Sequence, residues 1–214
     1  MIALIDYGAG NLTSVRKALT HLGAAFTTPT SPAGLADADG IIVPGVGHFE
    51  VTAALGPDWR RAILTQVERE RPLLGICVGM QWLFAGSAEA PGHRGLALMD
   101  GTCRLITDEP EPGSPAERSG TRRPLKVPHV GWNSLHLRRP SWLLDGVQEG
   151  DQVYFTHSFA APVTSDCVGS TRYGIEFAAA VERQAIAGVQ FHPEKSSDVG
   201  LRILGNFLAR VNGR

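Results

Sequence analysis

The chain lacks the cysteine pairs that would form a disulfide framework or hold a zinc ion. Its 214 residues contain three cysteines, Cys77, Cys103 and Cys167, which are far apart and include no Cys-x-x-Cys pair. Unpaired cysteines are typical of a reducing compartment. The N-terminal residues also lack the basic region, apolar run and cleavage site of a signal peptide. We therefore expect a cytoplasmic protein.

The chain also lacks an excess of positive charge and any long apolar run. Its 20 Lys and Arg residues balance 21 Asp and Glu residues, for a net charge of -1. A nucleic-acid partner is not expected, because binding phosphates requires a marked cationic face. A membrane span is not expected either, because no apolar stretch approaches the roughly 20 residues that a bilayer requires. The length suits a single domain over residues 1–214.

What the chain does contain is an alternation of short apolar runs and helical patterns. The runs at residues 2–5, 40–43 and 73–76 are expected strands. Between them, helices are expected from Asn11 or Thr13 to Gly23 and over residues 59–70. Strands that alternate with helices indicate an α/β fold, with a mainly parallel sheet covered on both faces. Ligands of such sheets bind where the carboxyl ends of the strands meet their loops.

The second half of the chain follows another pattern. Residues 108–126 are rich in Pro, Gly, Ser and charge, and we interpret them as a mobile surface excursion. Strand-like runs in a more antiparallel region follow at residues 152–155, 167–171, 177–181 and 185–189. A final helix is expected to be capped by Ser196 or Ser197, with an apolar face made by Val199, Ile203, Leu204, Phe207 and Leu208.

The most specific signal for catalysis is a cysteine flanked by glycines. Cys77 stands between an expected buried strand and a helix, with Gly75 and Gly79 two residues away on either side. This pattern is typical of a nucleophile elbow, where small neighbours permit a tight turn that exposes the central side chain. Free N–H groups at the helix start favour the thiolate. The alternative, a buried structural cysteine, is the interpretation we give to Cys103 and Cys167.

A thiol that expels an amine needs a proton shuttle, commonly a histidine oriented by a third group. His192 follows an expected strand, so it should lie at the same sheet edge as Cys77. Glu194 has a carboxylate that could hold the imidazole in one tautomer. A metal site made by His157, His192 and Glu194 is disfavoured, because no recognised ligand spacing accompanies them. We expect neither a metal nor a cofactor.

These residues together resemble the class I, triad-type glutamine amidotransferases, and the resemblance covers nearly the whole chain. The cysteine elbow and the His-Pro-Glu sequence at residues 192–194 carry the family resemblance. Residues 6–12, 44–49, 128–133 and 188–196 are similar to the glutaminase subunits that serve a barrel-shaped cyclase in histidine biosynthesis. The resemblance implies a flavodoxin-like, doubly wound sheet that is mainly parallel, with an additional antiparallel portion.

The resemblance also implies roles around the nucleophile. Cys77 would attack the side-chain amide of glutamine, and the resulting oxyanion would be met by the N–H of Val78 and that of Val46 or Gly47. The glycines beside Val46 would let its peptide turn over with little steric penalty. We therefore hypothesise that this oxyanion hole forms only when the partner holds its own substrate.

For recognition of glutamine, the resemblance implies Gln81 and Glu89, with the backbone of His157, Ser158 and Phe159 on the other side. Gln81 lies one helical turn after the nucleophile, which places both on one face of the helix. Glu89 is less specific, because a glutamate in a loop is usually only solvated.

The implied partner is the cyclase, in a heterodimer whose docking face includes Asn11, Trp132 and Lys195. An exposed tryptophan is a reasonable interface anchor, although packing of Trp132 within the subunit is equally open. The cyclase would use the ammonia to make imidazole glycerol phosphate and aminoimidazole carboxamide ribonucleotide. The alternatives are a glutaminase for another synthase, such as that for pyridoxal phosphate, a non-catalytic glutamine-binding regulatory subunit, and a free-standing γ-glutamyl hydrolase or cysteine peptidase.

Overall fold

The computed structural model of the protein describes residues 1–9, 12–107 and 125–213. Asn11 and residues 108–124 of the expected surface excursion lie outside the described residues. An eight-stranded sheet with the order β2-β1-β3-β4-β12-β11-β10-β7 forms the centre of the described part, and β5-β9 and β6-β8 form two small sheets. Pairing is parallel from β2 to β12 and antiparallel from β12 to β7. The predicted α/β fold with an added antiparallel portion is confirmed.

The strands of the large sheet are β1 (Ile2–Leu4), β2 (Phe26–Thr27), β3 (Gly40–Val43), β4 (Leu73–Ile76), β7 (His136–Leu137), β10 (Cys167–Tyr173), β11 (Ile175–Arg183) and β12 (Ile186–Val189). The small sheets contain β5 (Arg104–Leu105), β6 (His129–Ser134), β8 (Gln152–His157) and β9 (Phe159–Ala160). The helices are α1 (Leu12–His21), α2 (Pro57–Glu68), α3 (Val78–Trp82) and α4 (Ser197–Val211), with 3-10 turns η1 (Pro32–Leu35), η2 (Phe49–Ala54) and η3 (Pro193–Lys195).

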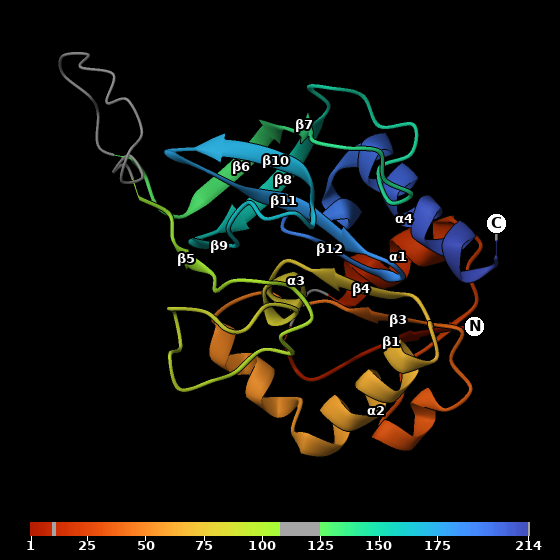
Figure 1. The fold of residues 1–214 in the computed structure, drawn as a ribbon. Helices are drawn as coiled ribbons and strands as arrows, with labels where there is room; N and C mark the ends of the chain where they lie inside the picture. Colours follow the sequence, from red (N-terminus) through yellow and green to blue (C-terminus); the bar gives the residue numbers. More distant parts are fainter. Residues whose placement is uncertain (10–11, 108–124, 214) are drawn as a thin grey trace, which may run out of the picture.

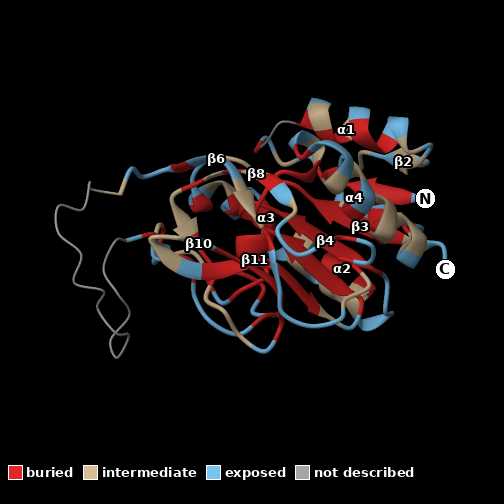
Figure 2. Cartoon of the chain, turned by 90° about the horizontal axis from the view of Figure 1, so that it is seen from above, coloured by how far each residue is buried: buried red, intermediate tan, exposed pale blue. Residues whose placement is uncertain are grey.

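Helices cover both faces of the parallel strands, with α1 and α4 on the side opposite α2 (Figure 1). Every residue of β1, β3, β4 and β12 is buried, which explains their continuous apolar sequence. Contact is close: a Cβ on Gly40 would stand 2.5 Å from the Val211 side chain of α4. Figure 2 shows the buried residues concentrated in this sheet and beneath its helices.

Most expected elements are confirmed, and their differences have local causes. The strands at residues 40–43 and 73–76 have the expected bounds. Helix α2 begins at Pro57, two residues early, because the fixed φ of proline suits the first helical position. Thr13 lies inside α1 and is not its cap. Strand β11 extends beyond the expected residues because its pairing with β10 continues to Ile175.

The expected capping role of Ser196 is wrong for its side chain. Ser196 holds the N-cap position of α4, but its hydroxyl makes no capping bond. Instead, Ser196 Oγ donates to the His192 carbonyl at 2.7 Å and accepts the Tyr154 N–H at 2.9 Å. Ser196 therefore ties the loop after β12 to β8.

None of the helices in the described ranges has the length and apolar character needed to span a membrane.

Candidate active site

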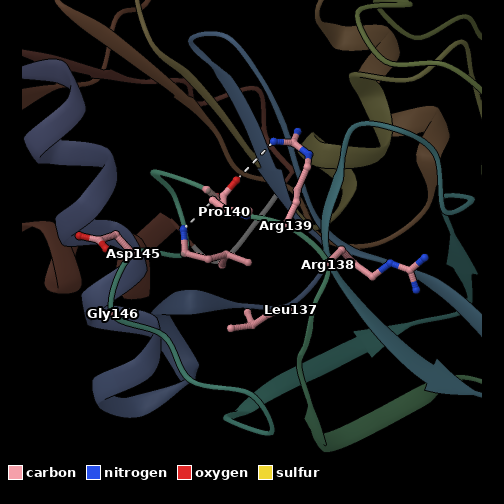
Figure 3. Close-up of a pocket in the computed structure, with 8 residues that line it drawn as sticks. Leu137, Arg138, Arg139, Pro140, Asp145 and Gly146 are labelled. Atoms are coloured by element: carbon pink, nitrogen blue, oxygen red, sulfur yellow. Dashed lines mark hydrogen bonds between the residues drawn. The ribbon is translucent and has the colours of Figure 1, made fainter.

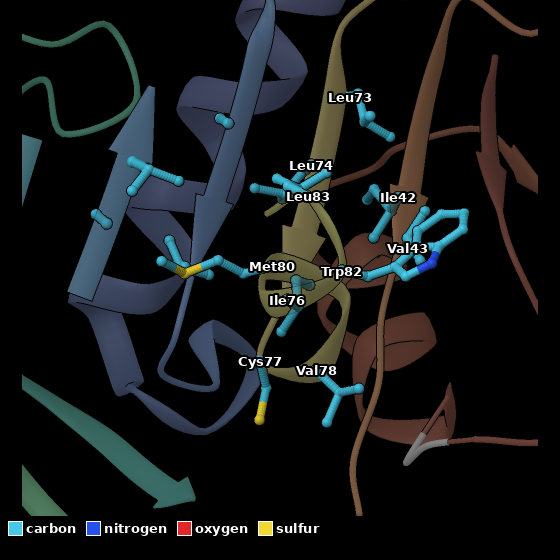
Figure 4. Packing of buried hydrophobic residues seen from close by; sticks show 14 of the residues in the cluster. Ile42, Val43, Leu73, Leu74, Ile76, Cys77, Val78, Met80, Trp82 and Leu83 are labelled. Carbon is cyan, nitrogen blue, oxygen red and sulfur yellow. The ribbon is translucent and has the colours of Figure 1, made fainter. Parts of the chain in front are cut away.

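Cys77 occupies a strained turn at the carboxyl end of β4. Its backbone has φ 54° and ψ −110°, a conformation that costs a non-glycine residue on the order of 1–3 kcal/mol. The turn is held on one side by the Cys77 N–H, which donates to the Val189 carbonyl at 2.7 Å. Figure 4 shows the sulfur pointing away from the surrounding core side chains. The geometry is that of the predicted nucleophile elbow.

The glycines beside Cys77 are required by close backbone contacts. A Cβ on Gly79 would stand 1.8 Å from the Val43 carbonyl oxygen, and a Cβ on Gly75 would stand 2.5 Å from the Gly79 oxygen. These distances are far below any van der Waals contact. Glycine is therefore required at both positions, because the backbone of Gly79 packs against that of Val43 in β3 and the backbone of Gly75 packs against that of Gly79.

His192 follows β12, the strand next to β4, and its side chain is buried beside Cys77. Its Nδ1 lies 2.9 Å from Glu194 Oε1, and the two side chains are only 1% and 2% exposed. Burial by itself would lower the pKa of His192, but the hydrogen bonds and negative charges of Cys77 and Glu194 raise it. The pair can therefore hold a proton on the imidazole opposite the sulfur. The structure brings the three predicted catalytic side chains together.

The Nε2 atom of His192 and Oε2 of Glu194 have no hydrogen-bond partner among the described residues. Because the Glu194 carboxylate accepts a hydrogen bond from Nδ1, the neutral imidazole carries its proton on Nδ1 and keeps a lone pair on Nε2, on the side of the Cys77 thiol. This arrangement lets Nε2 exchange a proton with a group bound at Cys77.

Gln81 is buried on α3, one turn after Cys77. Its Nε2 donates to the Phe159 carbonyl at 2.8 Å and to Gln190 Oε1 at 3.1 Å, while its Oε1 has no partner among the described residues. The free oxygen can accept from an amine such as that of glutamine. The predicted substrate role of Gln81 is consistent with this orientation.

Gln190 is a residue of the site that the sequence analysis missed. It is completely buried, and its Nε2 lies 3.8 Å from the Cys77 sulfur. An amide N–H directed at sulfur stabilises the thiolate, while its Oε1 fixes the amide of Gln81. Its position immediately before Phe191 and His192, at the end of β12, is the only sequence signal that could have suggested it.

The predicted oxyanion hole is closed in this structure. The Val78 N–H donates to the Gly45 carbonyl at 3.4 Å and so is not free to meet an oxyanion. Val46 is partly exposed, while Gly47 is exposed with φ +94°. The Gly45 carbonyl would have to turn away before Val78 could act as a donor.

The other predicted substrate-binding residues already have internal partners. One carboxylate oxygen of Glu89 accepts the Phe49 N–H at 2.7 Å. The Ser158 carbonyl accepts the Ile106 N–H at 2.8 Å. The Phe159 carbonyl accepts from Gln81 and from His157 Nδ1, the latter at 2.9 Å. Their roles in binding glutamine stay predictions.

A pair of buried histidines connects β6 to the site. His129 Nδ1 lies 3.1 Å from His157 Nε2, and His129 Nε2 lies 3.3 Å from Asn133 Nδ2. Because His157 Nδ1 donates to the Phe159 carbonyl, its Nε2 must accept from His129 when both rings are neutral. Burial lowers the pKa of His129 to about 4 and that of His157 to about 3.

These two histidines should make the protein less stable in mild acid. Below the ordinary histidine pKa of about 6.5, these two histidines are protonated in the unfolded chain but stay neutral in the folded protein. We expect the free energy of unfolding to fall by roughly 2 kcal/mol for each histidine between pH 6.5 and 5. His192 offsets little of this loss, because its raised pKa keeps it protonated in the folded protein while the unfolded chain takes up the same proton just below about pH 6.5.

Urea denaturation at several pH values measures this effect. His157→Asn should reduce the slope of stability against pH by about half, since one of two such histidines is removed. His21→Asn removes an exposed histidine at the end of α1 and should keep the wild-type slope. An unchanged slope in His157→Asn would contradict the assignment.

The predicted interface residues Trp132 and Lys195 belong to one surface cluster with Tyr154. Trp132 is 53% exposed, so the alternative that it packs inside the subunit is wrong. Its ring meets that of Tyr154 edge to face at 6.0 Å, and Lys195 Nζ lies 5.9 Å above the Tyr154 ring. The Tyr154 carbonyl accepts the His192 N–H at 2.9 Å. A backbone hydrogen bond therefore connects Tyr154 of the exposed cluster directly to His192, the candidate proton shuttle.

A separate hollow of about 390 Å³ lies beside the edge strand β7 (Figure 3). Its two arginines already have partners within the chain: Arg138 pairs with Glu176 at 2.9 Å and Arg139 donates to the Glu182 carbonyl at 2.7 Å. The hollow is separated from β4 by three strands of the sheet. It has no part in the site around Cys77.

Comparison with known proteins agrees with this fold. Residues 3–211 match the family model of the class I glutamine amidotransferases. Solved structures with the same fold include PurLQS from Thermotoga maritima, with a TM-score of 0.71, 16% identity and 98% of each chain covered. The glutaminase domain of Trypanosoma brucei CTPS gives a TM-score of 0.67 at 16% identity, covering 100% of this chain and 94% of that one. The chain belongs to the class I glutamine amidotransferase family.

Within that family the chain groups with the HisH subunits of imidazole glycerol phosphate synthase. It is 44% identical to the HisH subunit of Geobacillus kaustophilus, over 100% of this chain and 99% of the relative. It is 42% identical to that of Archaeoglobus fulgidus, over 97% of this chain and 98% of the relative.

Proposed function

We propose that this chain hydrolyses glutamine to glutamate and ammonia as the HisH subunit of an imidazole glycerol phosphate synthase. The observation that carries the proposal is the buried His192–Glu194 pair, 2.9 Å apart, set against a cysteine in a strained elbow. A buried structural cysteine would need neither the strain nor the charged partner. The full set of three side chains argues against a non-catalytic regulatory subunit.

In the proposed reaction, the Cys77 sulfur attacks the side-chain carbonyl carbon of glutamine and gives up its proton to His192. The C–N bond then breaks, His192 returns the proton to the leaving nitrogen, and a glutamyl thioester remains on sulfur. Water activated by His192 hydrolyses the thioester to glutamate. Glu194 stabilises the imidazolium in both steps, and Gln81 Oε1 accepts from the substrate amine.

We further propose that glutamine hydrolysis is slow until a partner is bound. The support is the Val78 N–H, which donates to the Gly45 carbonyl and so cannot stabilise an oxyanion. Turning the peptide between Gly45 and Val46 would remove this block and direct the Val46 N–H inward. Gly47, with φ +94°, provides the adjacent conformational freedom.

The proposed partner is a cyclase that binds the cluster of Trp132, Tyr154 and Lys195. Ammonia released beside His192 would pass directly to that subunit and avoid becoming ammonium in water. The cyclase would use it to form imidazole glycerol phosphate and aminoimidazole carboxamide ribonucleotide. The three unpaired cysteines support a reducing compartment, the cytoplasm, for this heterodimer.

The test is glutamate release from glutamine by the purified chain, alone, with a cyclase subunit, and with the cyclase and its nucleotide substrate. We expect hydrolysis to rise by about 100-fold or more in the full mixture, since removing one oxyanion donor costs about 10²–10³ in kcat. Full activity of the isolated chain would overturn the proposed block. Activity on γ-glutamyl peptides instead would identify a free-standing hydrolase, and activation by another synthase would identify a different partner.

A further inference from the structure

A tyrosine beside the nucleophile is unused by the proposed mechanism. Within the described residues, four buried polar side-chain atoms have no hydrogen-bond partner, and three of them belong to Gln81, His192 and Glu194. The fourth is the hydroxyl oxygen of Tyr7. Burying a hydroxyl without a partner is unfavourable, so such a group in a native structure requires an explanation.

The Tyr7 hydroxyl lies against the loop that forms the predicted oxyanion hole. A Cβ on Gly45 would stand 2.4 Å from Tyr7 Oη and 2.9 Å from Val78 Cβ. The carbonyl of the same Gly45 accepts the Val78 N–H. The hydroxyl, the loop and the first N–H of α3 therefore meet at one point beside Cys77.

The Tyr7 hydroxyl acts as a donor and not as a base. Burial first, and then the negative charge of the Cys77 thiolate, raise the pKa of Tyr7 well above its ordinary value. The hydroxyl therefore stays protonated at neutral pH.

We propose that Tyr7 is a positioning residue that holds the oxyanion loop in its active conformation by donating a hydrogen bond to the Gly45 carbonyl. The inference rests on the proposed glutaminase function and on the turning of the peptide between Gly45 and Val46. Rotation of that peptide breaks the hydrogen bond from the Val78 N–H to the Gly45 carbonyl and leaves the carbonyl without a hydrogen-bond donor.

One new hydrogen bond then satisfies two groups. The freed carbonyl is buried and needs a donor, and the neighbouring Tyr7 hydroxyl needs an acceptor. Once Tyr7 holds the carbonyl, the Val78 N–H is free for the oxyanion. Tyr7 thus favours the open hole without contacting glutamine.

Tyr7→Phe tests this role, because it removes one oxygen and keeps the ring. In the complex with the cyclase and its nucleotide, we expect kcat for glutamine hydrolysis to fall about tenfold, the value of one hydrogen bond, with KM within about twofold of the wild-type value. The melting temperature of the isolated chain should be unchanged or higher, because the unpartnered hydroxyl is gone. Alkylation of Cys77 by iodoacetamide should keep its rate, since that reaction forms no oxyanion.

The matched control is Tyr173→Phe, which removes a hydroxyl that donates to the Lys126 carbonyl at the surface; its kcat should equal that of the wild type. A Tyr7→Phe variant with wild-type kcat would overturn the inference while leaving the glutaminase proposal intact. A loss of kcat together with a lower melting temperature and slower alkylation would overturn it too, by showing a structural role. If the wild-type complex releases no glutamate, the proposed function itself fails.

Discussion

Replacing Cys77 by alanine should abolish glutamine hydrolysis, with kcat reduced at least about 10⁴-fold, because the proposed acyl intermediate forms on the Cys77 sulfur. Alanine keeps the Cβ, so the strain at φ 54° persists and the fold should remain close to that of the wild type. The measurement is glutamate release by the complex with the cyclase. The same complex supplied with ammonium salt should still form the cyclase product, since only the source of ammonia has been lost.

The matched control for this variant is Cys167→Ala. Cys167 is also buried and unpaired, but its thiol donates to the Gly169 carbonyl at 3.3 Å and lies in β10. Burial raises the pKa of its thiol to about 11, which keeps the sulfur unreactive. This variant should retain glutaminase activity within about twofold and lose on the order of 1 kcal/mol of stability. Substantial hydrolysis by Cys77→Ala would contradict the assignment of the nucleophile.

Replacing Gly79 by alanine should destabilise the protein by at least about 3 kcal/mol, or prevent folding. The added methyl group would stand 1.8 Å from the Val43 carbonyl oxygen, which belongs to backbone and not to a flexible side chain. Strand β3 is paired on one side with β1 and on the other with β4, so it cannot move aside. The midpoint of urea denaturation measures the loss, and glutamine hydrolysis should fall with it because Cys77 is displaced.

Gly205→Ala provides the comparison for this substitution. Gly205 lies inside α4, and a Cβ there would meet no atom within 4 Å apart from its chain neighbours and the nearby backbone of the same helix. Alanine at this helical position should stabilise the protein by about 0.5–1 kcal/mol. Equal denaturation midpoints for Gly79→Ala and the wild type would show that the elbow tolerates a displacement that the structure excludes.

The features predicted correctly from the sequence are those that depend on local pattern. The apolar runs at residues 40–43 and 73–76 predicted β3 and β4, because buried parallel strands need side chains that are apolar on both faces. The glycines at 75 and 79 predicted the elbow at Cys77, because only glycine permits that backbone contact. The proximity of Glu194 to His192 also follows from short spacing.

Local pattern failed where long-range contacts compete for a side chain. Serine is a typical helix-capping residue, and Ser196 stands at the N-cap of α4. Its hydroxyl nevertheless donates to the His192 carbonyl and accepts the Tyr154 N–H of a distant strand. The roles of Gln190 and His129 were not predicted, because their partners lie far away in the chain: Cys77 at the start of α3 for Gln190, and His157 of β8 for His129. The oxyanion donors were predicted from the resemblance. That resemblance did not reveal that the Val78 N–H already donates a hydrogen bond to the Gly45 carbonyl.

The sequence by itself determined the order of strands and helices, the strained turn at Cys77 and the presence of a histidine and a carboxylate two residues apart. Each of these follows from residue size, polarity and spacing along a short stretch of chain. Only the tertiary structure decided that the Tyr7 hydroxyl lies beside Gly45, that Gln190 faces the sulfur, and that the oxyanion donor is closed. Those contacts join segments far apart in the chain, so they depend on how the strands are ordered in the sheet.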